Sequence, residues 1–271
     1  MKRTLYVSDL DGTLLNSGQA VSAFTAQTVN DLVGAGMLFS YATARSFWTA
    51  SVITEAITAN IPVIVYNGAF IINNLTGERL YADYFTRKEA EEMLELLQQN
   101  GIDPIVYAVI DGTEKFSYLP ARINAQTKAF LDTRRGDRRD RPVEQMENLL
   151  DGAQFYFTCI GAHTPLKAVY AALRTQFSCV YQKEIYSGLP WLEIMPSGVS
   201  KANAVLRLKE LLDAERVVSF GDGKNDIPLF EVSDECYAVE NADIQLKEIA
   251  TGIIESNECD GVAKWLLKNY Q

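Results

Sequence analysis

The chain has 271 residues, of which 48% are hydrophobic, and a formal net charge of −10 at pH 7. This composition excludes disordered and collagen-like chains, and the length fits one large or two modest globular domains. The acidic balance argues against general nucleic-acid binding and against docking on anionic lipid, since both need a basic surface.

The first 80 residues alternate between strand and helix patterns. Apolar runs predict strands at residues 4–10, 37–42 and 62–66, and amphipathic segments between them predict helices at 22–35 and 46–59. This alternation is typical of a parallel sheet with helices on its faces, because each crossover returns over the sheet.

The middle of the chain has a different pattern. A capping box at Thr86-Arg-Lys-Glu89 opens a predicted helix that ends at Gly101, and the dipeptide Asp111-Gly112 predicts a hairpin between residues 105–110 and 114–118. Hairpins mixed with helices indicate an antiparallel α+β unit. The other elements expected here are helices at 125–131, 143–150 and 166–176 and strands at 155–160 and 179–182.

From about residue 192 the alternating pattern returns. We therefore expect a parallel-sheet core built from both ends of the chain, residues 1–82 and 189–271, with an α+β domain inserted at residues 83–188. The elements expected in the last part are strands at 192–195, 216–220, 236–239 and 252–255 and helices at 200–212, 242–249 and 261–269.

Neither a signal peptide nor a membrane helix is expected, since no apolar run approaches the ~18 residues that a membrane span needs. The basic segment 134–141 is interpreted as a solvated loop of the insertion, with a substrate-facing cation as the alternative. With a single histidine, His163, and no C-x-x-C pair, a zinc site is not expected. We interpret the four cysteines as reduced thiols of a cytoplasmic protein.

The first polar cluster that suggests chemistry is Asp9-Leu-Asp11-Gly-Thr, directly after the first predicted strand. Open α/β sheets bind their ligands at the carboxyl ends of the strands. Two carboxylates close together repel each other, so they need a cation or a shared proton, and Mg²⁺ prefers such oxygen ligands. For this pair alone, a turn with side-chain hydrogen bonds is the alternative.

Three other polar clusters follow predicted strands. Thr43 offers a hydroxyl, and the segment 221–226 adds two carboxylates, Asp222 and Asp226. Lys201 begins a predicted helix, which is an unfavourable place for a cation unless an anion lies nearby. We expect the four clusters to meet at one edge of one sheet, since their chance occurrence together is improbable.

These residues resemble the four motifs of the haloacid dehalogenase superfamily. The long insertion is similar to the type IIB cap of the Cof-like phosphatases, and the tail at residues 257–263 resembles the same group. Ala44 departs from the family pattern, which usually has glycine there, and adds one methyl group close to the phosphate loop. The residues that match the motifs in order are Asp9-x-Asp11-Gly-Thr, Thr43, Lys201 and Gly221-Asp222-Gly-x-Asn225-Asp226.

The resemblance implies a Rossmann-like α/β core with an inserted α+β cap domain, and a Mg²⁺-dependent phosphatase that forms an aspartyl-phosphate. It implies Asp9 as the nucleophile and Asp11 as the acid that protonates the leaving group and then deprotonates water. The metal ligands that it implies are Asp9, the main-chain carbonyl of Asp11, and Asp222. The implied phosphate-binding groups are the side chains of Thr43, Lys201 and Asn225 and the main-chain amides of Leu10 and Ala44. Arg45 and Asp226 are expected to support the substrate or the structure.

The expected substrate is a small phosphorylated metabolite, in particular a sugar phosphate, which the cap would select by closing over the site. We expect a monomer or weak homo-oligomer that binds neither nucleic acid nor a membrane. Two alternatives stay open. One is a phosphomutase similar to phosphomannomutases, and the other is a non-catalytic phosphate-binding module, which would be expected to lack Asp9, Asp11 or Lys201.

Overall fold

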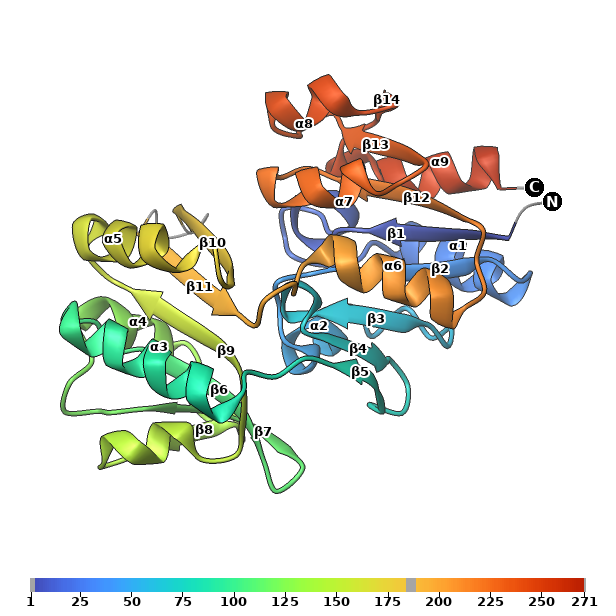
Figure 1. The fold of residues 1–271 in the computed structure, drawn as a ribbon. Helices are drawn as coiled ribbons and strands as arrows, with labels where there is room; N and C mark the ends of the chain where they lie inside the picture. The colour runs from blue at the N-terminus through green and yellow to red at the C-terminus, as the bar shows by residue number, and fades with distance from the viewer. Residues whose placement is uncertain (1–2, 184–188, 271) are drawn as a thin grey trace. The chain divides into compact units, whose positions relative to one another are not determined.

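The computed structural model describes residues 3–183 and 189–270. The chain forms two compact units, a core unit of Met1–Ala82 with Val199–Gln271 and an insert unit of Asp83–Gly198 (Figure 1). Residue 188, where the insertion was expected to end, lies outside the described residues. Residues 189–198 were expected in the core, and the structure corrects this. They belong to the insert unit because β11 (Pro190–Met195) pairs antiparallel with β9 (Ala153–Ile160).

The core unit is built on a parallel sheet of five strands in the order β14-β13-β12-β1-β2. The two sequence segments of the core unit meet inside this sheet, where Thr4 of β1 lies opposite Arg216 of β12. The sheet therefore aligns the carboxyl ends of strands that are far apart in sequence. The strands are β1 (Thr4–Ser8), β2 (Leu38–Tyr41), β12 (Arg216–Gly221), β13 (Glu235–Val239) and β14 (Gly252–Ile254).

Side-chain alternation along β1 explains how helices cover both faces of this sheet. Leu5 and Val7 are fully buried in a cluster with Val205 and Leu208 of α6. Tyr6, which points to the other face, packs its ring against Trp265 of α9. Burying a large aliphatic side chain contributes ~1.5–3 kcal/mol, so this alternation fixes the register of the strand. The helices of the core unit are α1 (Ala23–Gly34), α2 (Phe47–Ile53), α6 (Lys201–Leu211), α7 (Ile227–Glu231), α8 (Ile244–Ile249) and α9 (Gly261–Asn269).

A second, three-stranded antiparallel sheet follows the core sheet, formed by β3 (Pro62–Val65), β4 (Phe70–Asn73) and β5 (Arg79–Ala82). The strand expected at residues 62–66 was predicted as part of the parallel sheet. Only one parallel bridge, Ala42 to Ile64, links it to the end of β2, and its main pairing is with β4. The hairpin of β4 and β5 was not predicted, because its turn lacks an Asn-Gly or Asp-Gly signal.

The insert unit has a six-stranded sheet in the order β10-β11-β9-β6-β7-β8, antiparallel except for the β7–β8 pair. The capping box of α3 is confirmed at Thr86 and Glu89. The hairpin turn is confirmed as well, with positive φ at both Asp111 and Gly112. The other elements are β6 (Ile105–Ile110), β7 (Thr113–Tyr118), β8 (Asp140–Pro142), β10 (Ser178–Lys183), α3 (Arg87–Gln99), α4 (Ala125–Asp132), η3 (Met146–Leu150) and α5 (His163–Leu173).

Several sequence-based elements have wrong bounds, including the helix expected at 166–176, which runs from His163 to Leu173. The first strand ends at Ser8, because residues 10–14 form a wide turn closed by a hydrogen bond from Leu15 N to Leu10 O at 2.9 Å. The helix expected at 46–59 ends at Ile53. The hydroxyl of the next residue, Thr54, donates to the carbonyl of Ala50 at 2.8 Å. The helix expected at 143–150 is only a short 3₁₀ segment, since the amide of Val143 donates to Tyr118 instead.

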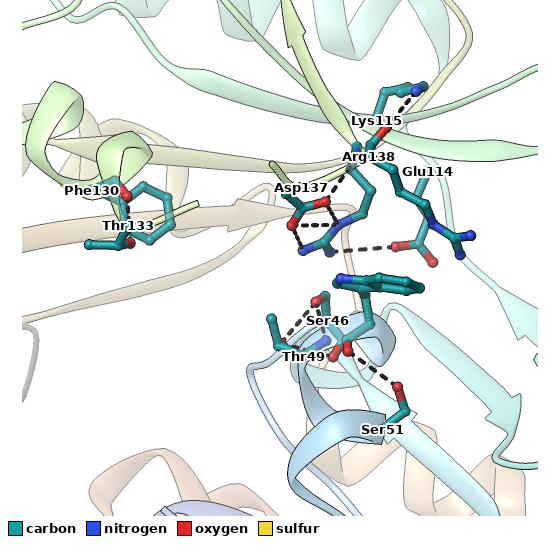
Figure 2. A network of polar contacts seen from close by, with 11 residues as sticks. Ser46, Thr49, Ser51, Glu114, Lys115, Phe130, Thr133, Asp137 and Arg138 are labelled. Carbon is teal, nitrogen blue, oxygen red and sulfur yellow. Dashed lines mark hydrogen bonds and ion pairs between the residues drawn. The ribbon is translucent and has the colours of Figure 1, made fainter. Parts of the chain in front are cut away.

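Arg139 shows that the basic segment 134–141 is not simply a solvated loop. Its side chain is 7% exposed, and Nη2 donates to Oδ2 of Asp137 at 2.6 Å. Nη1 lies 4.0 Å from Oε2 of Glu114, which Figure 2 labels together with Asp137. The guanidinium carbon lies over the ring of Phe116, 5.7 Å from its centroid. A cation as buried as this needs paired carboxylates. The solvated-loop interpretation is therefore wrong for Arg139.

The part of the chain that the structure describes contains no helix that is both long enough and apolar enough to cross a membrane.

Candidate active site

Asp9 directly follows β1, at the carboxyl end of an inner strand of the core sheet. Its amide donates to the carbonyl of Phe220 at 2.9 Å, so the pairing of β1 with β12 continues up to this residue. Gly12, at φ 77°, then turns the chain back. An ideal Cβ on Gly12 would lie 2.3 Å from Oδ2 of Asp222, so glycine makes room for that carboxylate beside the loop. The loop and the carboxylate thus form one wall of the site.

Lys201 is buried between two carboxylates. Its Nζ lies 2.5 Å from Oδ1 of Asp9 and 2.7 Å from Oδ1 of Asp226, and its side chain is 3% exposed. The strand before it, β11, belongs to the insert sheet, so the expectation that all four clusters follow strands of one sheet is wrong for Lys201. Lys201 reaches the site from the first turn of α6. The anion expected near this helix start is therefore provided by the protein itself.

The pKa values of the cluster reflect its burial first and the charges of its members second. Burial raises the pKa of Asp9 well above its ordinary value, opposed by Lys201 and reinforced by Asp226 and Asp222. Burial alone would lower the pKa of Lys201, but Asp226 and Asp9 raise it. The pKa of Asp222 rises to about 6, chiefly by burial and then by the charge of Asp226. The cluster would therefore gain from a second cation.

Asp226 is fully buried and uses both of its carboxylate oxygens within the protein. Oδ1 accepts from Lys201, and Oδ2 accepts from the amides of Asp222 and Gly223 at 3.2 and 3.1 Å. Asp226 therefore positions Lys201 and shapes the loop that carries Asp222.

The residues present fit a divalent cation. Asp9, Asp222 and Asp226 each offer a carboxylate oxygen, and these oxygens lie within 4.8 Å of one another. Because Asp226 is already bound on both oxygens, Asp9 and Asp222 are the carboxylates suited to hold a metal ion. An oxygen-only donor set with few protein carboxylates is typical of Mg²⁺ sites.

Asp11 points to a different set of partners. Its two carboxylate oxygens accept from Arg45, from Nε at 2.8 Å and from Nη2 at 2.6 Å. Nη2 of Arg45 also donates to Oε1 of Gln19 at 2.7 Å. The Asp11 carboxylate thus lies outside the cluster of Asp9, Asp222 and Asp226, and Arg45 supports Asp11.

The remaining expected residues lie on loops at the same edge of the core sheet. Thr43 is buried after β2, and its hydroxyl accepts from the amide of Arg45 at 3.1 Å, with Ala44 half-buried between them. Leu10 is fully buried, and Asn225 is exposed in the short 3₁₀ segment Lys224–Asp226. In the described residues, neither Thr43 nor Asn225 bonds directly to Asp9 or Lys201.

Asn241 is a residue of this edge that sequence reasoning missed. Its Nδ2 donates to the carbonyl of Gly12 at 2.7 Å, and its Oδ1 accepts from the amide of Asn257 at 3.1 Å. Two residues on, the amide of Asp243 donates to the carbonyl of Asp222 at 2.8 Å. The segment after β13 thus forms hydrogen bonds to both acidic loops, the one that contains Gly12 and the one that contains Asp222. The signal was available, because this segment also follows a strand of the parallel sheet.

A sequence profile of the haloacid dehalogenase-like hydrolases matches residues 6–266. The chain is 26% identical over 275 residues to the 5-amino-6-(5-phospho-D-ribitylamino)uracil phosphatase YwtE of Bacillus subtilis (strain 168), covering 95% of each chain. It is 25% identical to YitU, a phosphatase of the same name from that organism, covering 98% of this chain and 97% of that one. A solved haloacid dehalogenase-like hydrolase from Bacteroides thetaiotaomicron has a TM-score of 0.79 at 23% identity, covering 99% of this chain and 100% of that one.

These matches cover the core unit and the insert unit together. They confirm the expected α/β fold and the Cof-like subfamily, and the names of the relatives support the expected enzyme class, a phosphoric monoester hydrolase. The chain belongs to the haloacid dehalogenase-like hydrolase family.

Proposed function

We propose that this hydrolase is a Mg²⁺-dependent phosphatase of small phosphorylated metabolites, with Asp9 as its nucleophile. The observation that carries the proposal is the environment of Asp9. The carboxylate is buried, bonded to Lys201, and grouped with Asp222 in a set that fits a divalent cation. A carboxylate of this kind can attack phosphorus once the charge of the phosphate is neutralised.

In the first step an oxygen of Asp9 forms a bond to phosphorus, and the bond from phosphorus to the leaving oxygen breaks. A proton from Asp11 goes to that oxygen, so the product leaves as an alcohol. In the second step water attacks the aspartyl-phosphate, Asp11 takes the proton of the water, and inorganic phosphate leaves with Asp9 restored. When bound by Asp9, the Asp11 carbonyl and Asp222, Mg²⁺ neutralises charge on the phosphoryl oxygens.

Asp11 must exchange a hydrogen bond from Arg45 for one to the leaving group before it can donate a proton. In the structure both of its oxygens accept from Arg45, and a carboxyl oxygen that gives a proton to the leaving group must face that group. Proton donation therefore requires that one Asp11 oxygen is freed from Arg45.

The phosphoryl group is proposed to bind the Lys201 ammonium, the Thr43 hydroxyl, the Asn225 amide and the main-chain amides of Leu10 and Ala44. Lys201 is already fixed by Asp226, so it stabilises developing charge without having to reorganise.

We propose a sugar phosphate or similar compound as the substrate, and the insert unit as the cap that selects it. The names of the two Bacillus subtilis relatives contain a phosphorylated ribityl group, which supports a phosphorylated sugar-like chain. We also propose that the enzyme acts in the cytoplasm as a monomer or weak homo-oligomer. The four free cysteines are in keeping with a reducing compartment.

The test is a screen of phosphorylated metabolites with Mg²⁺, which reports kcat/KM and the product of each. Wild type is expected to release inorganic phosphate from p-nitrophenyl phosphate and from a subset of sugar phosphates. EDTA should stop turnover and Mg²⁺ should restore it. Asp9→Asn should abolish release while the thermal midpoint stays near that of wild type. Transfer of phosphate within a sugar bisphosphate, without release, would show a phosphomutase instead, and near-normal turnover by the variant would refute the nucleophile.

A further inference from the structure

A buried bend follows β3 and carries unusual backbone angles. In this bend, Tyr66–Gly68, three consecutive residues have positive φ, at 51°, 54° and 107°. Tyr66 is 3% exposed and Asn67 is 5% exposed. A tyrosine in the left-handed region is uncommon, and such residues persist only where the surroundings hold them, often at functional sites.

One side of the bend holds the loop of Thr43. The amide of Asn67 donates to the carbonyl of Thr43 at 2.9 Å, and the amide of Tyr66 donates to the carbonyl of Arg45 at 2.9 Å. Two main-chain hydrogen bonds thus fix the backbone on both sides of Ala44. The position of the Thr43 hydroxyl therefore depends on the shape of the bend.

The other side of the bend touches the start of α6. An ideal Cβ on Gly68 would lie 2.3 Å from the carbonyl oxygen of Ser200 and 3.2 Å from Cβ of Ala204. Ser200 caps α6 by accepting from the amide of Asn203 at 3.1 Å, and Lys201 is the first residue of the helix. Only glycine allows this approach, so the bend also determines the position of the start of α6 and of Lys201, its first residue.

We propose that the bend Tyr66–Gly68 is a positioning element that sets the distance between the Thr43 hydroxyl and the Lys201 ammonium, and so the fit of the phosphoryl group. The inference rests on the proposed function, in which both groups bind phosphoryl oxygens. Asp222, proposed to bind the metal, lies on the loop after β12, where its Oδ1 accepts from the hydroxyl of Thr13. The bend is connected to the metal ligands through the bond from Lys201 to Asp9, so it is expected to affect phosphate binding much more than metal binding.

The test compares Gly68→Ala with Gly36→Ala. Gly36 has a closely similar φ of 102°, but an ideal Cβ there meets no described atom within 4 Å. The alanine in both variants has about the same unfavourable φ, but only the Cβ of Gly68→Ala would clash with the carbonyl of Ser200. Binding of inorganic phosphate to the Mg²⁺-loaded protein is measured by calorimetry, and binding of Mn²⁺ by electron paramagnetic resonance.

Gly68→Ala is expected to weaken phosphate binding by about tenfold relative to Gly36→Ala, because displacing a binding group by about an ångström costs up to ~10²-fold. Mn²⁺ affinity should change much less than phosphate affinity in both variants. Equal phosphate affinities of the two variants would overturn the inference, and so would parallel losses of phosphate and Mn²⁺ binding.

Asn67→Gly keeps the result decisive if Gly68→Ala does not fold. Glycine accepts the left-handed angle and retains the amide that donates to Thr43, so the bend can still form, although losing the buried Asn67 side chain should lower the thermal midpoint. The bend becomes less rigid, and phosphate affinity should fall while Mn²⁺ affinity holds. Unchanged phosphate affinity in this variant would overturn the inference. If wild type releases no phosphate from any ester, both the proposed function and the inference fail. If wild type turns over normally and the variants keep wild-type phosphate affinity, only the inference is refuted.

Discussion

Lys201→Met tests whether one ammonium holds the acidic cluster together. Methionine keeps an unbranched stem of similar length and removes the charge. The ammonium now lies within 2.7 Å of two carboxylates, those of Asp9 and Asp226, whose side chains are 7% and 0% exposed. The variant would leave both carboxylates buried next to each other with no cation between them.

The size of the effect follows from this burial. Removing one partner of a buried ion pair costs ~3–5 kcal/mol, because the remaining charge stays desolvated. Asp226 keeps the two amide hydrogen bonds on its other oxygen, which offsets part of the loss. We therefore expect the core unit to lose about 3 kcal/mol of unfolding free energy, toward the lower end of that range.

The assay is urea unfolding in EDTA, followed by a signal from the core unit. With a slope of about 2 kcal/mol per molar urea, a loss of about 3 kcal/mol moves the midpoint down by about 1.5 M. The double variant Lys201→Met with Asp226→Asn removes one stranded charge and should recover a large part of this shift. A midpoint for Lys201→Met close to that of wild type would refute the reasoning, and so would a double variant less stable than the single one.

Two further predictions concern the two units separately. Gly12→Ala should abolish Mn²⁺ binding and turnover, because its Cβ would lie 2.3 Å from Asp222, whereas Gly112→Ala has the same φ of 77° with open space and should retain both. Arg139→Met should destabilise the insert unit by about 2 kcal/mol at pH 7, because it leaves the half-buried Asp137 without its main cationic partner. Burial raises the pKa of Asp137, but the hydrogen bonds and charge of Arg139 outweigh this and lower it, so the pair stabilises above the unfolded pKa of ~3.9 and fades as pH falls below it. The difference in urea unfolding between wild type and the Arg139 variant should therefore shrink as the pH falls below ~3.9, and a difference that stays constant on acidification would contradict the pairing.

The residues of the acidic cluster could be found from the sequence because each had a local signature. Asp9 and Asp222 directly follow buried strands, and parallel strands bring their carboxyl ends to one edge. Lys201 was marked by its unfavourable place at a helix start. Physical rules about single elements were sufficient in these cases.

Pairing between distant segments could not be predicted in the same way. β11 has the apolar pattern of a core strand, and only its partner β9 places it in the insert unit. The buried Arg139 follows three arginines and an aspartate in a polar segment, and its burial depends on Phe116 and Glu114 of another strand. The strain at Tyr66 likewise has no local signature, since the sequence does not show that neighbouring loops hold the bend.

The net charge of −10 does not disfavour a phosphate ligand, because the relevant charge is that of the site. Around Asp9 the structure gathers three carboxylates and one ammonium, and a divalent cation would bring this group to neutrality. Asp11 is already balanced by Arg45. A phosphate dianion would therefore approach a neutral pocket that presents Lys201 and amide donors. The acidic residues on the surface are solvated and screened within ~10 Å, so they influence solubility and partner choice more than this site. A polyanionic polymer would lie along the acidic surface within that range and be repelled, whereas a small phosphate ester needs to meet only the site.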